Sequence, residues 1–279
     1  MTHFNKIAIV SRTTRSEHQI QCQQIVDLLI EKYGSSVYMN ESFGKNMNYT
    51  KITPMEQLND FDLVIAFGGD GTILWTSRYT NETPLFGINA GHLGFLTAST
   101  LKDGLKNLQR VMSGGYILEH CMRLNVKLNG KELPSALNEA YITNKLSAHI
   151  CHLDLYVDDF YLGKHLLDGI LVSTPVGSTA YALSAGGSII EPSFKAMQIV
   201  PVNSVSRRMR PFLIPVGSTI SITVPESFDG EVIVINDGFL EGKLHPDSIV
   251  KLTMANKKTI FVRFPDYGFF NRLKDKLDF

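Results

Sequence analysis

Residues 61–72 read FDLVIAFGGDGT, an apolar run followed by a turn that holds three glycines, an aspartate and a threonine. The run 61–67 is typical of a buried parallel strand, and the pattern of 72–79 can start a helix. Glycines let the backbone approach a ligand closely, and amide groups at the start of a helix bind anions. Asp70 breaks this pattern, because a carboxylate repels phosphate unless a metal ion or the chemistry of a substrate requires it. The stretch therefore predicts a loop that handles phosphate or a nucleotide.

Asp70 itself has two interpretations. An aspartate after glycines is common in turns and helix caps, which would make it structural. A carboxylate among amides that hold a polyphosphate can also accept a proton from an attacking hydroxyl or hold a divalent ion. A second polar loop with a glycine, residues 174–181, favours the chemical interpretation.

The segments around this stretch alternate between strand and helix patterns. Residues 6–10, 37–39 and 84–89 are short and apolar, as strands are. Between the first two, apolar residues recur at helical spacing from Cys22 to Tyr33 and stop near Gly34. Such a βαβ series predicts a parallel sheet whose right-handed crossovers bring the turns together at the carboxyl edge.

The pattern changes after a further helix, predicted for 101–112 and ending at Gly114-Gly115. Residues 124–128 alternate in polarity and run into Asn129-Gly130, a strong signal of a β-hairpin. An antiparallel β domain of roughly 150 residues is expected from here, interrupted by a short helix after Ser178. Its further strands are predicted at 153–157, 219–224, 231–235, 249–254 and 259–264, with turns at Asp229-Gly230 and Asn256-Lys257.

An amphipathic helix is predicted for 267–277, and it could fold back onto the first domain. We therefore expect an N-terminal α/β domain over 1–100, which carries the Gly68–Thr72 loop, a C-terminal β-rich domain over 101–265, and a returning helix over 266–279.

Composition limits the classes of partner. The 27 basic and 27 acidic residues cancel, so charge gives no case for nucleic acid or an anionic membrane as the main partner. Three widely spaced cysteines, Cys22, Cys121 and Cys151, argue against a disulfide framework and for a reducing compartment. No apolar leader precedes the strand at 6–10, and no run reaches the length of about 18 apolar residues that spans a membrane. A soluble, cytoplasmic protein is expected.

The second loop belongs to residues 168–187, which read DGILVSTPVGSTAYALSAGG. Its hydroxyls, small residues and helix-start amides suit ribose and phosphate oxygens, and Tyr181 offers a flat face or a phenol donor. The structural alternative is that Ser178 caps a helix and the rest is core. Asn138-Glu139 could likewise hold an adenine edge or ribose hydroxyls, or could be an ordinary surface pair.

Three further patterns are weaker. Residues 89–94, NAGHLG, have the spacing of a dinucleotide-binding turn with Asn in the first glycine position, and the lysine-containing P-loop pattern is absent. A zinc site at His149, Cys151 and His152 is not favoured, since alternate strand residues point to opposite faces. The basic cluster is either a solvated turn or a phosphate clamp, and it comprises Arg207, Arg208 and Arg210.

Taken together, four motifs resemble the NAD kinase family in order and spacing: GGDGT at 68–72, GINAGHLGFL at 87–96, NEA at 138–140 and the 168–187 stretch. The first motif alone is also similar to diacylglycerol-type lipid kinases and phosphofructokinases. The resemblance covers nearly the whole chain. It implies a Rossmann-like N-terminal domain, a β-sandwich-like C-terminal domain that binds NAD, and a homotetramer or dimer. The implied reaction is transfer of the γ-phosphoryl group of ATP to the adenosine 2′-hydroxyl of NAD, assisted by a divalent ion, expected to be Mg²⁺.

The resemblance also assigns roles to residues. Asp70 is implied as the catalytic base, Asn138 and Glu139 as holding the ribose and nicotinamide-side groups, and Phe95 as packing on a base. The other residues implied to contact NAD are Gly71, Asp168, Thr179, Ala180, Tyr181, Ala182, Leu183 and Ser184. The residues implied to serve the ATP phosphates are Gly68, Gly69, Gly71 and Thr72.

The chain departs from the family pattern at a few positions. Leu166 and Leu167 stand where a polar residue and glycine are usual, which removes one polar contact to NAD. Phe239 replaces a frequent Gln, and Asn203 replaces a small apolar residue. Two other functions remain open: a lipid kinase of the diacylglycerol type, which shares the first loop, and a non-catalytic sensor that binds NAD(P), which the departures at Leu166 and Phe239 permit.

Overall fold

The computed structural model describes residues 4–12, 16–89, 91, 93–146, 149–206 and 209–277, without the side chains of residues 16 and 17. The chain forms two compact units, each with its own core. Unit 1 comprises Met1–His120 together with Thr259–Phe279, and unit 2 comprises Cys121–Lys258. Within the described residues, no helix is long and apolar enough to cross a membrane.

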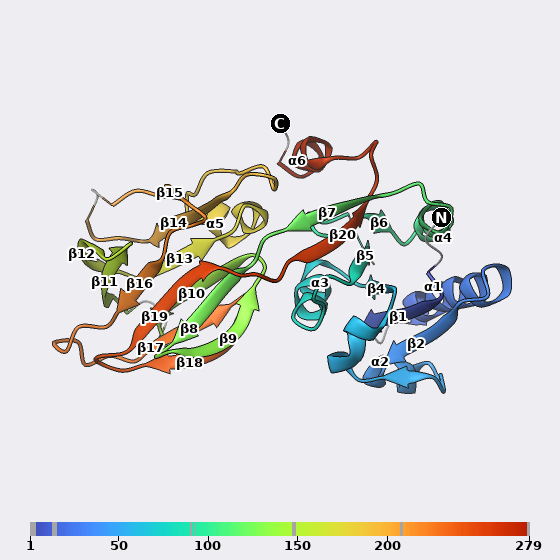
Figure 1. Ribbon diagram of the computed structural model, residues 1–279, viewed down its shortest axis with the longest axis horizontal. Coiled ribbons are helices and arrows are strands. Elements are labelled where there is room, and N and C mark those ends of the chain that lie inside the picture. The colour runs from blue at the N-terminus through green and yellow to red at the C-terminus, as the bar shows by residue number, and fades with distance from the viewer. Residues whose placement is uncertain are drawn as a thin grey trace. The chain divides into compact units, whose positions relative to one another are not determined.

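Unit 1 is built on one sheet with the strand order β3-β2-β1-β4-β5-β20-β7, and β6 pairs with β5 (Figure 1). The pairs β1–β2, β1–β4, β4–β5 and β5–β20 are parallel. The strands are β1 (Lys6–Ser11), β2 (Ser36–Asn40), β3 (Ile52–Thr53), β4 (Leu63–Phe67), β5 (Pro84–Asn89), β6 (Ser99–Thr100), β7 (Ile117–Cys121) and β20 (Thr259–Arg263). The α-helices are α1 (Ser16–Asp27), α2 (Glu41–Asn46), α3 (Asp70–Ser77), α4 (Gly104–Met112) and α6 (Phe269–Leu277).

The parallel strands are continuous apolar runs because helices and loops cover both faces of such a sheet. All five residues of β4 are buried, and so are the last five of β1. The predicted strands at 6–10, 37–39, 61–67 and 84–89 are confirmed, as are the helices at 101–112 and 267–277. The order of the first five strands confirms the Rossmann-like arrangement.

Unit 2 consists of two six-stranded antiparallel sheets, ordered β15-β14-β13-β10-β17-β18 and β12-β11-β16-β19-β8-β9. Apolar side chains from both sheets, such as Val126 and Leu252 from one and Ile142 and Val172 from the other, form a single buried cluster. The unit is therefore a β-sandwich, as expected. Its strands are β8 (Leu124–Leu128), β9 (Lys131–Ala136), β10 (Glu139–Asn144), β11 (Cys151–Val157), β12 (Phe160–Leu167), β13 (Gly169–Ser173), β14 (Ala196–Val202), β15 (Phe212–Pro215), β16 (Ile220–Thr223), β17 (Val232–Asn236), β18 (Phe239–Leu244) and β19 (Ile249–Met254).

Two-residue turns join three of the hairpins. Asn129-Gly130 between β8 and β9 has φ values of 50° and 82°, and Asp237-Gly238 between β17 and β18 has 51° and 83°. Positive φ at both positions is the conformation that suits a tight hairpin, and Asn, Asp and Gly tolerate it best. Phe239 therefore stands at the first position of the strand that leaves such a turn. Asp158-Asp159 forms the third turn, between β11 and β12.

The strand predicted at 259–264 is present as β20, but the prediction assigned it to the wrong sheet. It was included in the antiparallel domain, but β20 pairs in parallel with β5, and Ile260 lies opposite Pro84. All five residues of β20 are buried, which is typical of a strand inside a parallel sheet rather than of a half-buried antiparallel one. Because α4, β7 and β20 all belong to unit 1, the chain passes from unit 1 into unit 2 between residues 120 and 121 and returns between 258 and 259. The boundaries expected from the sequence were 100/101 and 265/266.

Candidate functional site

In unit 1, the glycine turn follows the buried strand β4 and leads into α3. Gly68 has φ +154°, and a Cβ at this position would clash with the side chain of Thr72. Its N–H donates to the carbonyl of Ile88, 2.9 Å away, which ties the turn to β5. Gly69 caps α3, Asp70 is its first residue, and Gly71 is exposed. The turn therefore presents the start of a helix, as the sequence predicted.

The carboxylate of Asp70 is held by a second loop of the same unit. It accepts hydrogen bonds from the N–H of Phe95 at 3.0 Å and of Leu96 at 3.2 Å. A Cβ at Gly94 would overlap this carboxylate, so glycine is what permits the close approach. These bonds run to a loop 25 and 26 residues further on. They give Asp70 a fixed orientation that a helix-capping role alone does not require.

In unit 2, a buried carboxylate fixes the backbone around Asn138 and Glu139. Asp237 accepts hydrogen bonds from the N–H groups of Leu137 and Asn138 at 2.7 Å each and from that of Glu139 at 3.2 Å. Asp237 lies in the tight turn between β17 and β18. The turn thus positions a segment about 100 residues away in the sequence.

Both side chains of this pair are buried. Within the residues that the structure describes, Asn138 Oδ1 and Glu139 Oε2 have no hydrogen-bond partner. Burial, together with the charge of Asp237, raises the pKa of Glu139 to about 8. Burial also raises the pKa of Asp237, although its three N–H donors and Arg123 oppose that shift. Glu139 is therefore largely protonated at neutral pH, so it can donate a hydrogen bond as well as accept one.

The second loop packs directly on this pair. It contains a 3₁₀ turn (Val176–Thr179) followed by the short helix α5 (Tyr181–Ser184). A Cβ at Gly177 would overlap the backbone of Asn138, so only glycine permits this contact. Thr174 Oγ1 donates to the carbonyl of Leu137 at 2.6 Å and accepts from the N–H of Gly177 at 3.1 Å. Unit 2 thus brings Asn138, Glu139 and Gly177 together.

Ser178 does not cap the following helix. Its hydroxyl donates to the carbonyl of Pro175 at 2.6 Å and accepts from the N–H of Ile190 at 2.9 Å, so it fixes the loop from inside. Ala180 occupies the cap position of α5. The helix-cap alternative for Ser178 is therefore wrong, because its oxygen is engaged elsewhere.

The residues from 179 to 184 differ in exposure. Tyr181 is exposed and its ring meets that of Tyr141 edge-on, with centroids 5.3 Å apart. Ala182 is buried in a small apolar cluster with Leu171. Thr179, Ala180 and Leu183 are half-buried, and Ser184 is exposed. Tyr181 and Ser184 therefore offer their side chains to a ligand, whereas Ala182 supports the turn.

Asp168 lies away from Asn138 and Glu139. The register of β10 and β13 places Glu139 opposite Ser173 and Thr143 opposite Gly169. Asp168 precedes Gly169, so the five-residue strand β13, about 15 Å long, separates it from Asn138 and Glu139. Its carboxylate accepts a hydrogen bond from Asn203 Nδ2 at 2.8 Å. Asn203, with φ 48°, is suited to this position by its side-chain amide and by its tolerance of positive φ.

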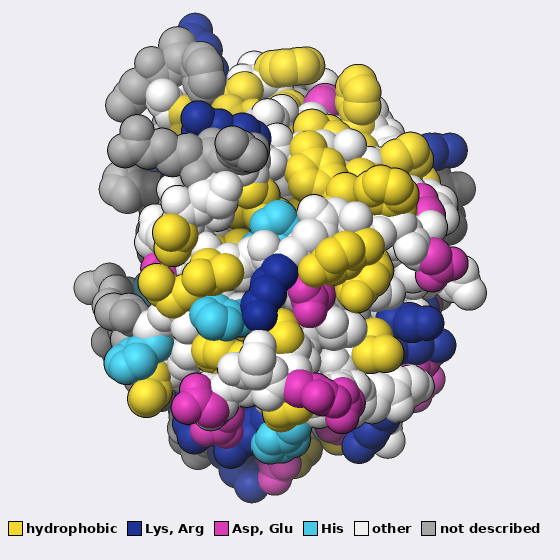
Figure 2. Space-filling model, turned by 90° about the vertical axis from the view of Figure 1, so that its left-hand side faces the viewer, with side chains coloured by type: hydrophobic (Ala, Val, Ile, Leu, Met, Phe, Trp, Pro, Cys, Tyr) yellow, Lys and Arg dark blue, Asp and Glu magenta, His cyan; other side chains and the backbone are white. Residues whose placement is uncertain are grey.

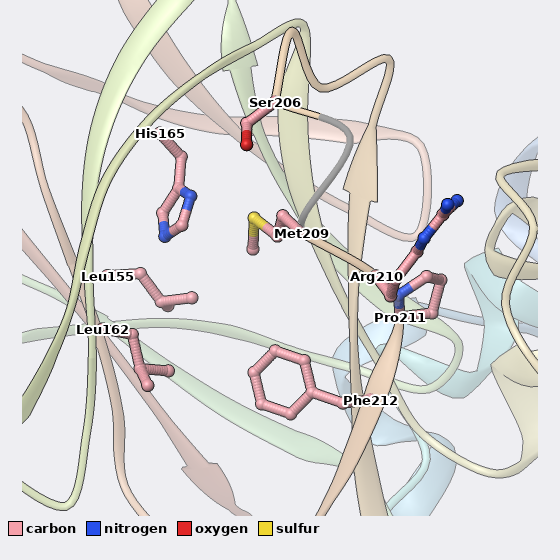
Figure 3. Close-up of a pocket in the computed structure, with 8 residues that line it drawn as sticks. All are labelled: Leu155, Leu162, His165, Ser206, Met209, Arg210, Pro211 and Phe212. Carbon is pink, nitrogen blue, oxygen red and sulfur yellow. The ribbon is translucent and has the colours of Figure 1, made fainter.

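Other predicted positions are only partly described. Arg207 and Arg208 lie outside the described residues, as do Ala90 and His92 of the 89–94 turn. Arg210 borders a cavity of about 500 Å³ in unit 2. Figure 3 shows Leu155, His165, Met209 and Phe212 pointing into this mostly apolar cavity while Arg210 extends away from it.

Two supporting residues were missed from the sequence. Neither Asp237 nor Arg263 was among the predicted site residues, although Phe239, two residues after Asp237, was identified as a departure from the family pattern. One signal was available for Arg263: a charged residue ends an otherwise apolar strand, and a charge is rarely buried without partners. Asp237-Gly238 also had the composition of a hairpin turn.

The fold and the two loops define a class: a two-unit protein in which a parallel sheet carries a glycine turn with an oriented carboxylate, and a β-sandwich presents a buried amide and carboxyl pair. The family models of the ATP-NAD kinase N-terminal domain and C-terminal domain match residues 7–116 and 137–264.

Two relatives named NAD kinase support this match. The one from Methanosarcina acetivorans is 36% identical over 98% of this chain and 99% of its own length. The one from Thermococcus gammatolerans is 39% identical over 81% of this chain and 82% of its own length. The chain therefore belongs to the NAD kinase family.

Solved structures agree on the fold. The crystal structure of yeast NADH kinase complexed with NADH has a TM-score of 0.90 at 24% identity, over 100% of this chain and 89% of that one. The crystal structure of an NAD kinase from Archaeoglobus fulgidus in complex with ATP has a TM-score of 0.76 at 22% identity, over 98% of this chain and 97% of that one.

Proposed function

We propose that this protein is an ATP-dependent NAD kinase, which transfers the γ-phosphoryl group of ATP to the adenosine-ribose 2′-hydroxyl of NAD and yields NADP and ADP. The observation that carries the proposal is the Asp70 carboxylate, half-buried beside a helix start and oriented by two backbone N–H groups. Membership of the family supports the identity of both substrates.

Asp70 acts as the base in this proposal. It orients the 2′-hydroxyl and accepts its proton while the oxygen forms a bond to the γ-phosphorus and the bond to the departing ADP breaks. Because the N–H groups of Phe95 and Leu96 fix the carboxylate, little reorganisation is needed during the step. The turn Gly68, Gly69, Gly71 and Thr72 holds the ATP phosphates in this proposal. The N–H groups of Gly68 and Thr72 donate to the carbonyls of Ile88 and Gly69, so the N–H groups of Gly69 and Gly71 and the hydroxyl of Thr72 are the donors that serve the phosphates.

A divalent ion, Mg²⁺, accompanies ATP in this proposal. The described residues contain no group of three or more His, Cys, Asp and Glu side chains that could hold a metal ion. Mg²⁺ commonly needs no such group, since it keeps several waters and binds through substrate phosphates plus one or two carboxylates. The Gly68–Thr72 turn offers one carboxylate for such a site, that of Asp70. When bound, the ion offsets charge on the transferred phosphoryl group.

Asn138 and Glu139 hold the ribose and nicotinamide-side groups of NAD in this proposal. Asn138 Oδ1 and Glu139 Oε2, which are buried and find no partner in the described part of the chain, support it, because such an atom is costly and a ligand hydroxyl or amide can satisfy it. Phe95 packs on a base. The turn from Thr179 to Ser184 lines the nucleotide cleft in this proposal, with Tyr181 and Ser184 offering exposed side chains and the buried Ala182 supporting the turn.

We also propose that the protein is a homo-oligomer, a tetramer or dimer, in which Asp168 serves the site of a neighbouring copy. The separation of Asp168 from Asn138 and Glu139 by the length of β13 supports this. So do exposed apolar side chains near Asp168 and along the edge strands β12 and β15, namely Phe160, Leu162, Leu166, Val205 and Leu213. Figure 2 views the side on which β11, β12 and β15 lie in Figure 1, and hydrophobic side chains gather there in several groups.

Mixing two inactive variants tests the shared site. Asp70→Asn and Asp168→Ala are expected to be inactive alone, and dissociating and reassembling them together should restore part of the activity, because some sites then receive both native residues. No recovery in a confirmed mixed oligomer contradicts the shared site.

A cytoplasmic location is proposed as well, supported by three cysteines that are too few and too widely spaced for a disulfide framework.

The reaction is tested by incubating the protein with NAD, ATP and Mg²⁺ and detecting NADP with an NADP-specific dehydrogenase. A signal that needs all three supports the kinase. Saturable NAD binding without NADP favours the sensor, and phosphorylation of diacylglycerol without NADP favours the lipid kinase.

The role of Asp70 is tested by Asp70→Asn, which should lower kcat by about 10²–10⁴-fold while NAD still binds. Asp62→Asn is a matched control, since Asp62 also accepts two backbone N–H bonds in unit 1, from Asn5 and Lys6, but precedes β4 instead of following it. Unchanged turnover of Asp70→Asn would remove Asp70 from the role of base.

A further inference from the structure

Arg263 is a buried arginine, 4% exposed, at the end of the apolar strand β20. Its guanidinium donates to three consecutive carbonyls of the loop beside Asp70. Nη1 reaches the carbonyls of Leu96 at 2.8 Å and Thr97 at 3.1 Å, and Nη2 reaches that of Phe95 at 3.3 Å. One side chain thus fixes three successive peptide groups, which only a planar group with several donors can do.

The same loop holds the carboxylate of Asp70. The peptide group between Phe95 and Leu96 carries both contacts: its carbonyl accepts from Arg263, and its N–H donates to Asp70 Oδ1. A peptide group is planar and rigid, so its two ends move together. A shift of the guanidinium therefore displaces the donor that orients Asp70.

Arg263 is itself held from the other side. Its Nε donates to Glu119 Oε2 at 2.8 Å, and Arg272 of helix α6 reaches Glu119 Oε1 at 3.3 Å. Burial raises the pKa of Glu119, but the two guanidiniums outweigh burial and hold the pKa below its usual value. Glu119 is therefore ionised at neutral pH, and the buried charge of Arg263 is paired.

We propose that Arg263 is a positioning residue for the phosphoryl transfer, which acts by holding the 95–97 loop so that its N–H groups orient Asp70. The inference rests on the proposed role of Asp70 as base. Glu119 supports it by fixing the guanidinium. The strand that carries Arg263 comes from the far end of the sequence, 167 residues beyond Leu96.

Arg263→Lys is the first test. Lysine keeps the charge but is a single point donor on a flexible stem, so it cannot hold Glu119 and three carbonyls at once. We expect kcat to fall about tenfold to a hundredfold, since small misplacements of a catalytic group are that costly, while the dissociation constant of NAD changes less than about threefold. Arg272→Lys is the matched control, because it disturbs the other ion pair of Glu119, the one made by Arg272 of α6. It should lower the melting temperature similarly and kcat much less.

A double-mutant cycle separates positioning from general stability. In the Asp70→Asn background, Arg263→Lys should leave the residual single-turnover rate unchanged within about twofold, because there is no longer a carboxylate to orient. An equal fold-loss in both backgrounds overturns the inference. If Asp70→Asn alone leaves the rate unchanged, the proposed base fails instead, and the two failures are distinguishable.

Glu119→Gln gives a second reading that keeps Arg263 in place. It removes the charge that fixes the guanidinium while keeping an oxygen acceptor. We expect Glu119→Gln to lower kcat when Asp70 is present. In the Asp70→Asn background it should cause no further loss of kcat. An unchanged kcat for both Arg263→Lys and Glu119→Gln in folded protein overturns the inference.

Discussion

Glu139 should make unit 2 less stable as pH rises, and Glu139→Gln should remove that dependence. The folded protein keeps the Glu139 proton until a pKa of about 8, whereas an ordinary glutamate loses it at 4.5. Between these values the unfolded chain binds fewer protons than the folded one. The free energy of unfolding therefore falls as pH rises through this window.

The size of the effect follows from the two pKa values. Each unit of difference corresponds to about 1.4 kcal/mol, so the raised pKa of Glu139 costs about 3 kcal/mol at pH 7 and up to about 5 kcal/mol above pH 8. Relaxation and water entry reduce this figure, and a change of about 2–4 kcal/mol is expected in experiment. Glutamine has a similar shape and does not titrate. Its stability relative to the wild type should grow by this amount between acid and alkaline pH.

The assay is urea unfolding of both proteins without ligand at about pH 5 and about pH 9, on either side of the window. The single tryptophan, Trp75, lies in unit 1, so its fluorescence follows that unit, and far-UV circular dichroism adds the strands of unit 2. Glu119→Gln is a control at a carboxyl whose pKa shift has the opposite direction, and its stability difference should be the same at both pH values. The pKa of Glu119 is lowered, so its contribution is complete above 4.5 and is lost only as pH falls below it. A stability difference for Glu139→Gln that is the same at both pH values would refute the reasoning.

Three further predictions concern the packing around the two loops. Gly94→Ala places a Cβ against the Asp70 carboxylate and should lower kcat about a hundredfold with little change in NAD affinity. Gly217→Ala is the control and should be neutral, because a Cβ there meets no atom within 4 Å. A normal kcat for Gly94→Ala would contradict the close approach. Gly177→Ala pushes against the backbone of Asn138 and should weaken NAD binding measured by calorimetry, and an unchanged affinity would separate this loop from the NAD site. Asp237→Asn replaces an acceptor of three N–H bonds by an amide that accepts fewer, so hydrogen exchange at Leu137, Asn138 and Glu139 should speed up; unchanged protection would argue that β10 alone fixes the segment.

The sequence predicted the local elements well because their signals are local. The buried run before Gly68, the Asn129-Gly130 turn and the amphipathic C-terminal helix each depend on a dozen residues or fewer, and the structure confirms all three. The first loop was predicted for the same reason, since the glycines and Asp70 are adjacent in the chain.

What the sequence could not predict are the long-range partners of those elements. β20 reads as one more short strand, and nothing within it indicates that its neighbour is β5, about 175 residues earlier. Asp237 and Arg263 act on loops about 100 and 167 residues away, so their roles appear only when the sheets are assembled. The distance of Asp168 from Glu139 follows from strand register, which a single sequence does not specify.

The position of β20 also bears on how the protein is made. During synthesis, residues 121–258 emerge as one continuous stretch and can fold into a sandwich as soon as they leave the ribosome. The sheet of unit 1 has to wait, because β20 fills the place between β5 and β7 and is translated only afterwards. Until then the start of β5, where Pro84 and Leu85 pair with β20, keeps an unpaired edge that can pair with other chains. Strand β20 therefore completes a sheet whose other strands are all translated before unit 2.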